Sequence, residues 1–181
     1  MGPFAFRLFG RSRAEQDADR LFAVVTAVAR RPSFYGEGRV PDSFDGRFEV
    51  LVAVAALALM RLKAEPKGAR LAQEFTDRLF LGLDDSLREV GVGDLSVPKQ
   101  MKALARRVYG RVQAFGEALA SDAPADALSQ ALARNVWAEA APPFAVTLAA
   151  WMGAAHAAFA EAPIERLFEG AAWPEVRGGA D

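Results

Sequence analysis

The sequence predicts an all-α protein, built as a single compact domain of about six to seven helices with a long central helix. Apolar residues recur at intervals of three and four almost throughout, as they do on one face of a helix, and no segment alternates apolar with polar residues as a strand does. A chain of 181 residues that is 52% hydrophobic is long enough to bury one real core. We divide it into an N-terminal arm (1–13), a helical domain (14–170) and a C-terminal tail (171–181).

Two helices are predicted in the first third of the chain, over 14–30 and from the end of the loop 33–46 to about 64. Pro32 ends the first helix, because the residue before a proline avoids the helical region. The uncharged run 50–60 is too short to cross a bilayer and predicts a buried helix at the centre of the protein. Three side chains in the loop can cap this second helix: Asp42, Ser43 and Asp45.

A third helix is predicted after Gly68, running to position 83 or as far as 90. Gly91 then provides a left-handed C-terminal cap. A fourth, longer helix starts at a cap formed by Asp94 or Ser96 and reaches Ala120. Its apolar stripe consists of Val97, Met101, Leu104, Val108, Val112, Phe115 and Leu119.

Shorter helices are predicted over 125–138 and 143–160, with a last turn over 164–168. The uncharged stretch 140–160 invites a transmembrane interpretation. Its many alanines are near neutral for insertion, and together with two prolines they favour a packed helix instead. The single histidine, His156, lies in this alanine-rich helix, where a packed or surface residue is a more common outcome than a heme ligand.

The composition argues against an enzyme. There is no cysteine and only one histidine, which excludes disulfides, thiolate metal sites and cysteine nucleophiles. Asp84 and Asp85 are adjacent, so on a helix their side chains point about 100° apart and do not converge on a substrate. A net charge of −1 gives no general attraction to nucleic acid. We therefore expect no catalytic residue, metal, cofactor or DNA partner, and the lack of a secretory signal favours a cytoplasmic location.

Two segments carry unusual motifs. The first, from Phe34 to Glu49, reads FYGEGRVPDSFDGRFE, and the second, from Leu83 to Lys99, reads LDDSLREVGVGDLSVPK. Met101-Lys102 and Tyr109-Gly110-Arg111 follow the second segment. In composition, order and spacing these motifs resemble the ubiquinol–cytochrome c chaperone family, over about residues 21–119. Two positions depart from the family pattern: Val54 stands where members often have a histidine, and Val90 where they often have a methionine.

The resemblance implies an assembly chaperone for the respiratory cytochrome bc1 complex. It implies cytochrome b as the client, allows for a second assembly factor as partner, and allows a peripheral contact with the cytoplasmic face of the inner membrane. A chaperone of this kind is expected to expose an apolar patch or groove on a helical body. The loop that contains Tyr35, Val40 and Pro41 is our candidate for part of that surface.

The glycines and caps of the second motif have a structural role as turn formers, and the same turn can also display a rigid contact surface. Lys99, Lys102 and Arg106 share a face of the fourth helix. This face either solvates the helix or pairs with the acidic segment 74–94, or it docks on anionic lipid, ribosomal RNA or an acidic partner loop. The predicted partner-binding residues are Tyr35, Val40, Pro41, Asp42, Arg47, Arg88, Glu89, Asp94, Lys99, Lys102 and Arg106.

The N-terminal arm combines aromatic residues with arginines and has no acid. It can lie on a membrane surface, with its aromatic rings at the headgroup boundary, or it can pack on the body of the protein or be disordered. Together with the basic face, it defines the alternative function: a membrane-peripheral scaffold or adaptor that binds anionic lipid or an acidic partner without holding the client. The predicted membrane-contact residues are Phe4, Phe6, Arg7 and Phe9.

Overall fold

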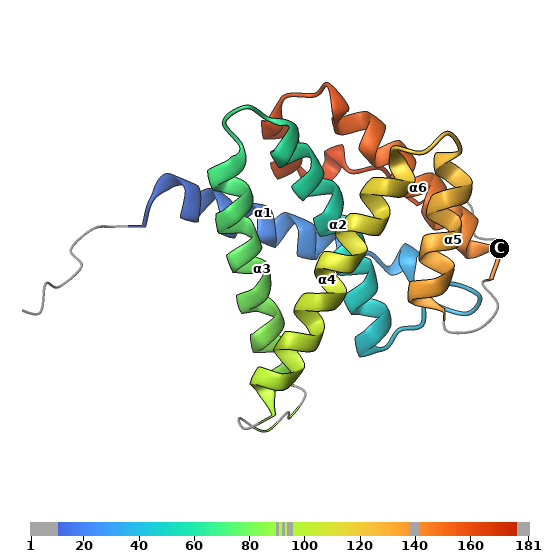
Figure 1. The fold of residues 1–181 in the computed structure, drawn as a ribbon, viewed down its shortest axis with the longest axis horizontal. Coiled ribbons are helices and arrows are strands. Elements are labelled where there is room, and N and C mark those ends of the chain that lie inside the picture. Colours follow the sequence, from blue (N-terminus) through green and yellow to red (C-terminus); the bar gives the residue numbers. More distant parts are fainter. Residues whose placement is uncertain (1–10, 90, 92, 94–95, 138–141, 177–181) are drawn as a thin grey trace, which may run out of the picture.

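The protein is all-helical, as predicted (Figure 1). The computed structural model describes residues 11–89, 91, 93, 96–137 and 142–176. Within these residues the α-helices are α1 (Arg13–Ala29), α2 (Phe44–Ala64), α3 (Ala69–Glu89), α4 (Val97–Leu119), α5 (Pro124–Val136) and α6 (Phe144–Ala160). The described residues also form three 3-10 helices: η1 (Pro32–Phe34) lies between α1 and α2, and η2 (Ile164–Phe168) and η3 (Gly170–Ala172) follow α6.

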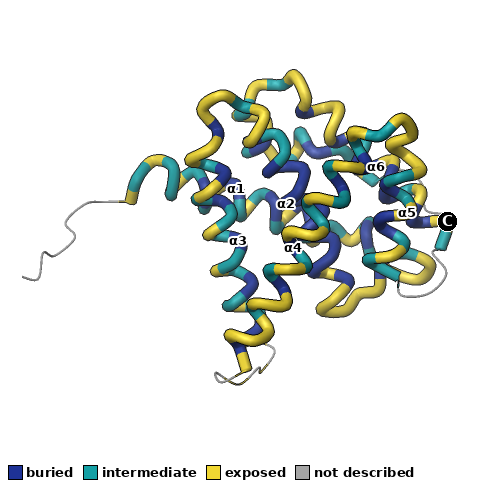
Figure 2. Tube along the Cα trace, viewed as in Figure 1, coloured by how far each residue is buried: buried dark blue, intermediate teal, exposed yellow. Residues whose placement is uncertain are grey.

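Helix α2 is the centre of the fold, as its uncharged run predicts. Every residue from 52 to 59 is buried, so the helix has no solvent-facing side over these two turns (Figure 2). Helices α1, α3, α4, α5 and α6 all pack against it. No helix among the described residues is long and apolar enough to cross a membrane.

Helices α3 and α4 are antiparallel neighbours, and the end of α3 and the start of α4 extend beyond the other helices (Figure 1). Helix α1 lies beside α3 and runs in the same direction, because Asp19 pairs with Arg78 and, one turn later, Phe22 meets Gly82. Helices α5 and α6 pack together on the far side of α2 (Figure 1). Each of α1, α3 and α4 buries one apolar stripe, as the spacing predicts.

The helix termini settle the choices that the sequence left open. Of the three candidate caps for α2, Ser43 is the N-cap, and its hydroxyl accepts a hydrogen bond from the Gly46 amide at 3.1 Å. Gly91 adopts φ +81°, the left-handed conformation predicted for it, and its amide donates to the Arg88 carbonyl. Ser96 occupies the N-cap position of α4 without a side-chain cap bond, and Asp94 lies outside the described residues.

The loop before α2 packs directly on the first turn of that helix. A Cβ atom at Gly46 would lie 2.0 Å from the carbonyl oxygen of Pro41, so only glycine lets the two backbones approach this closely. The same loop is closed by an isolated bridge between Tyr35 and Val40, in which the Val40 amide donates to the Phe34 carbonyl at 3.1 Å. Of the three glycines in the first motif, Gly46 is therefore explained by its contact with Pro41.

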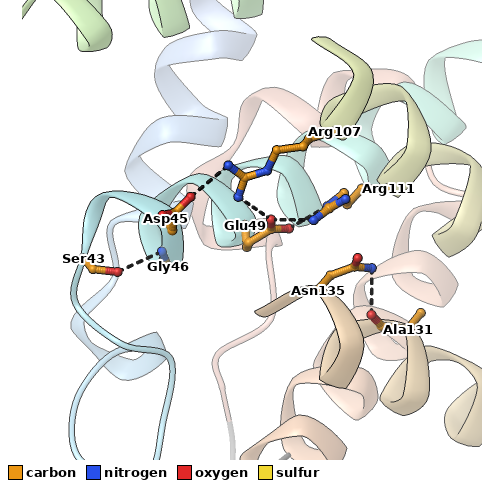
Figure 3. A network of polar contacts seen from close by, with 8 residues as sticks. All are labelled: Ser43, Asp45, Gly46, Glu49, Arg107, Arg111, Ala131 and Asn135. Atoms are coloured by element: carbon orange, nitrogen blue, oxygen red, sulfur yellow. Dashed lines mark hydrogen bonds and ion pairs between the residues drawn. The ribbon is translucent and has the colours of Figure 1, made fainter. Parts of the chain in front are cut away.

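A buried ion-pair network ties α2 to α4 (Figure 3). Glu49 is only 2% exposed and is the one buried charged residue in the described part of the chain. Its carboxylate accepts hydrogen bonds from Arg107 at 2.8 Å and from two nitrogens of Arg111 at 2.9 and 3.0 Å. Arg107 also pairs with Asp45 at 2.8 Å and stacks over the ring of Phe48. We call these four charged residues the Glu49 network.

The C-terminal segment is fixed to the end of α1. The guanidinium group of Arg31 donates to the carbonyl oxygens of Gly170, Trp173 and Pro174, at 2.8, 3.2 and 2.7 Å. Trp173 is buried, and its ring packs against Phe159. The division into arm, helical domain and tail stays a prediction, although Trp173, at the start of the predicted tail, belongs to the core.

Gly46→Ala should destabilise the protein by about 1–3 kcal/mol, because the new methyl group must push the loop away from α2. Gly110→Ala is the matched control: it also lies in a helix, but a Cβ added there would have no atom within 4 Å, so it should stabilise by about 0.5–1 kcal/mol. Urea unfolding measures both. Equal effects of the two substitutions would contradict the role assigned to the Pro41 contact.

Arg111→Met should cost about 2–4 kcal/mol in unfolding free energy, because the buried Glu49 carboxylate keeps only Arg107 as a partner. Arg106→Met, one residue before Arg107 and exposed to solvent, is the control and should change stability by less than about 0.5 kcal/mol. Chemical denaturation at neutral pH compares the two. A loss below about 1 kcal/mol for Arg111→Met would mean that the network adds little to stability.

Candidate partner-binding groove

An open hollow of about 990 Å³ lies between α1 and α3. The exposed alanines Ala23 and Ala27 of α1 and Leu81 of α3, which is 62% exposed, line it. Small side chains on α1 therefore leave room for an apolar ligand beside a large exposed leucine. The lining residues of this first hollow come from α1 and its two flanking residues Arg11 and Arg30, and from α3.

A second hollow, of about 360 Å³, adjoins the first and lies between α1, α2, α3 and the loop before α2. Its lining includes the aromatic residues Tyr35, Phe44 and Phe48. We call the first the outer hollow and the second the inner hollow. They share five lining residues, so we treat them as one surface and call it the α1–α3 groove. The shared residues are Phe22, Thr26, Arg30, Arg78 and Asp85.

Phe22 lies at the junction of the two hollows. Arg78 stacks over its ring at 4.3 Å and also pairs with Asp19. The tip of the ring reaches Gly82, where an added Cβ would lie 2.3 Å away. The absence of a side chain at Gly82 thus sets how far the Phe22 ring can extend toward α3, and so sets the depth of the groove at this point.

Tyr35 closes the inner end of the groove. Its hydroxyl donates to the carbonyl oxygen of Ala29 at 2.6 Å, and the guanidinium group of Arg47 lies 5.1 Å from its ring centre. Arg47 makes a two-pronged ion pair with Asp42, at 2.6 and 3.1 Å. Burial raises the pKa of the Tyr35 phenol to about 12, although the charge of Arg47 opposes this shift. Tyr35 therefore stays neutral at physiological pH and acts as a hydrogen-bond donor.

The rim of the groove carries more acids than bases. Six carboxylates and four arginines line the two hollows, and two of the arginines, Arg11 and Arg78, already pair with Asp19. The acids are Glu15, Asp19, Glu74, Asp77, Asp85 and Glu89, and the bases are Arg11, Arg30, Arg47 and Arg78. A ligand that combines apolar and basic side chains matches this surface best.

The structure brings together four of the residues predicted to bind a partner. Tyr35 and Arg47 line the inner hollow with Glu89 of α3, and Asp42 joins them through its ion pair with Arg47. Val40 is fully buried beneath the loop and offers no surface to a partner in this conformation. Their role in binding stays a prediction.

The other predicted residues lie elsewhere. Pro41 is exposed on the loop, and Arg88 pairs with Asp84 at 2.8 Å. Lys99, Lys102 and Arg106 are exposed along α4, and no ion pair to an acid is found for them among the described residues. The remaining predicted residues lie outside the described part of the chain: Asp94, Phe4, Phe6, Arg7 and Phe9.

The basic face of α4 continues into an exposed tyrosine that packs on a partly buried phenylalanine. Tyr109, three residues after Arg106, is 59% exposed, and its ring lies 5.7 Å from that of Phe80 on α3. Two other bases of α4, Arg107 and Arg111, face α2 instead and belong to the Glu49 network. Among the described residues, no acid of α3 forms an ion pair with Lys99, Lys102 or Arg106.

Motif reasoning missed most of the groove, because Phe22, Arg78 and Leu81 lie on α1 and α3 outside the motifs. It also missed the Glu49 network. The signal for the network was present: Asp45 and Glu49 are four residues apart, as are Arg107 and Arg111, so each pair shares a helix face.

Tyr35 should titrate about two pH units above an ordinary tyrosine, whose pKa is about 10. Because the folded state holds the proton more tightly, the stability that Tyr35 contributes is complete below pH 10 and is lost as the pH rises toward 12. The Tyr109→Phe variant keeps an aromatic ring beside Phe80 and leaves Tyr35 as the only tyrosine. Its tyrosinate absorbance, followed against pH, gives the midpoint directly, and a midpoint near 10 would contradict the burial described here.

Comparison with known proteins bears on this geometry. The sequence model of the family described as Ubiquinol-cytochrome C chaperone matches residues 37–174. The crystal structure of the Cbp3 homolog from Brucella abortus is similar, with a TM-score of 0.75 and 42% sequence identity over 87% of this chain and 88% of that chain. A comparison with curated proteins gives no match. The matched region contains the second motif segment and the first one from Glu37 onward, and the chain belongs to the ubiquinol–cytochrome c chaperone family.

Proposed function

We propose that this protein is an assembly chaperone that holds cytochrome b, or a related membrane client, during biogenesis of the respiratory bc1 complex. We further propose that the α1–α3 groove is where the client binds. Family membership supports the first statement, since the family is that of the ubiquinol–cytochrome c chaperones. The groove, lined by apolar side chains and by more acids than bases, is the observation that carries the second.

The floor of the groove suits an apolar segment of a client. Leu81 is 62% exposed and Phe44 36% exposed, and both are large apolar side chains that line the groove. Each would leave water when an apolar chain lies in the groove, which contributes about 25 cal/mol for each Å² of apolar surface buried, before the entropic cost of binding is subtracted.

The rim suits the regions that flank such a segment. Loops of a membrane protein on the cytoplasmic side are rich in lysine and arginine. The acids Asp85 and Glu89 lie along the inner half of the groove, where they would attract such loops. A membrane protein not yet inserted thus presents both features that the groove matches: apolar helices and basic connections.

A second function is favoured by one observation, the exposed basic face of Lys99, Lys102 and Arg106 beside Tyr109. Tyrosine and basic side chains together are common where proteins meet a membrane interface. In this alternative the protein is a membrane-peripheral scaffold that binds anionic lipid or an acidic partner, and the groove is not used to hold the client.

The test is complementation of a host strain that lacks the gene, with cytochrome b measured in membranes by its heme spectrum and by immunoblot. Leu81→Arg combined with Asp85→Arg should fail to restore cytochrome b, because both changes place positive charge on exposed groove positions. Val146→Arg with Asp126→Arg is the matched control, since Val146 on α6 is 63% exposed, Asp126 is exposed on α5, and neither lines the groove. This control should restore cytochrome b fully.

Two other results would contradict the proposal. Full restoration by the groove variant would remove the groove as the client site. Failure of Lys102→Glu with Arg106→Glu, alongside a functional groove variant, would favour the scaffold instead. Unchanged cytochrome b in the deletion strain would mean that the chain serves a different client.

A further inference from the structure

The ten residues that precede Arg11 are rich in the side chains that the α1–α3 groove accepts. They contain three phenylalanines and a leucine, together with an arginine, and they have no acid. Arg11 and Arg13 extend the positive charge into the start of α1. This composition is complementary to a groove with an apolar floor and an acidic rim.

The point where this segment joins the body lies in the groove itself. Arg11 lines the outer hollow, where its guanidinium group pairs with Asp19. Its carbonyl oxygen accepts a hydrogen bond from the side-chain amide of Gln16 at 2.9 Å. Residues 1–10 are therefore tethered at the outer end of the groove.

The length of the segment matches the length of the groove. Helix α1 has 17 residues and so spans about 25 Å. Ten extended residues reach at most about 33–36 Å, enough to run back along α1 to the inner hollow. In an extended chain, positions 4, 6 and 8 share one face, so Phe4, Phe6 and Leu8 can turn together toward the groove floor.

We propose that residues 1–10 fold back along α1 and occupy the α1–α3 groove of the same molecule. The arm then covers Ala23, Ala27 and Leu81, and Arg7 lies within reach of the rim acids Glu74 and Asp77. The occupant is an intramolecular one, which a client must displace. That regulatory consequence rests on the proposed function, whereas docking of the arm does not.

The chain has no cysteine, so single cysteines can be placed without background. Six extended residues cover about 20 Å, the rise of about 13 helical residues, so an arm that runs back from Arg11 places Ala5 near position 24, about one helical turn from Ala27 and within reach of a bismaleimide. The double variant Ala5→Cys, Ala27→Cys is treated with a short bismaleimide, in the full-length protein without client. The matched control is Ala5→Cys, Ala154→Cys, because Ala154 is exposed on α6 and does not line the groove.

Docking predicts an intramolecular crosslink to position 27 at least about tenfold faster than to position 154, because a docked arm has a higher effective concentration there than a free tether. Phe4→Ser with Phe6→Ser should remove this preference. Glu74→Lys with Asp77→Lys, two surface changes that leave the core intact, should slow the crosslink severalfold. High salt should slow it in the same direction.

Equal rates to the two positions would overturn the proposal, since the arm would then favour no surface. Crosslinked dimers whose yield rises with protein concentration would also overturn it, because the occupant would be the arm of a second copy. The experiment contains no client, so its failure leaves the proposed function standing. A client that does not use the groove, in turn, would leave the crosslink unchanged.

Discussion

Burying α2 on all sides imposes the main constraint on this fold. A helix that is apolar around its whole circumference has to be surrounded, and five other helices pack against it. The one carboxylate buried with it in the described chain, on Glu49, needs positive partners, and α4 supplies Arg107 and Arg111. These bonds fix the register of α4 on α2. Helices α1 and α3 pack on another side of α2 and on each other, and the groove forms where their outer faces separate.

The spacing of apolar residues in the sequence predicted most of the fold. Helix positions followed from the spacing of apolar residues, and the ends agreed to within a few residues where Pro32, Gly68 and Gly91 punctuate the chain. The cap of α2 could not be chosen, because three neighbouring side chains offer an oxygen. In the structure each of the three has a different partner: Ser43 caps the helix, Asp42 pairs with Arg47, and Asp45 pairs with Arg107.

The candidate site was predictable only where it coincides with the motifs. Tyr35, Arg47 and Glu89 come from the two motif segments and meet at one hollow. The rest of the groove depends on α1 lying parallel to α3, and the register between these two helices is set by their common packing on α2. Each of the two helices shows an apolar stripe in the sequence, but a stripe does not specify which residues of the neighbouring helix it will contact.

The three hydrogen bonds from Arg31 to the C-terminal segment affect how the chain folds during synthesis. It joins the end of the first helix to carbonyl groups about 140 positions later, the longest-range hydrogen bonds in the described structure. Contacts of such high sequence separation slow folding, since a large loop must close before they form. A nascent chain therefore has no complete body to close around α2 until Pro174 has left the ribosome. Until then, α1 lacks the contacts that Arg31 makes with residues 170–174.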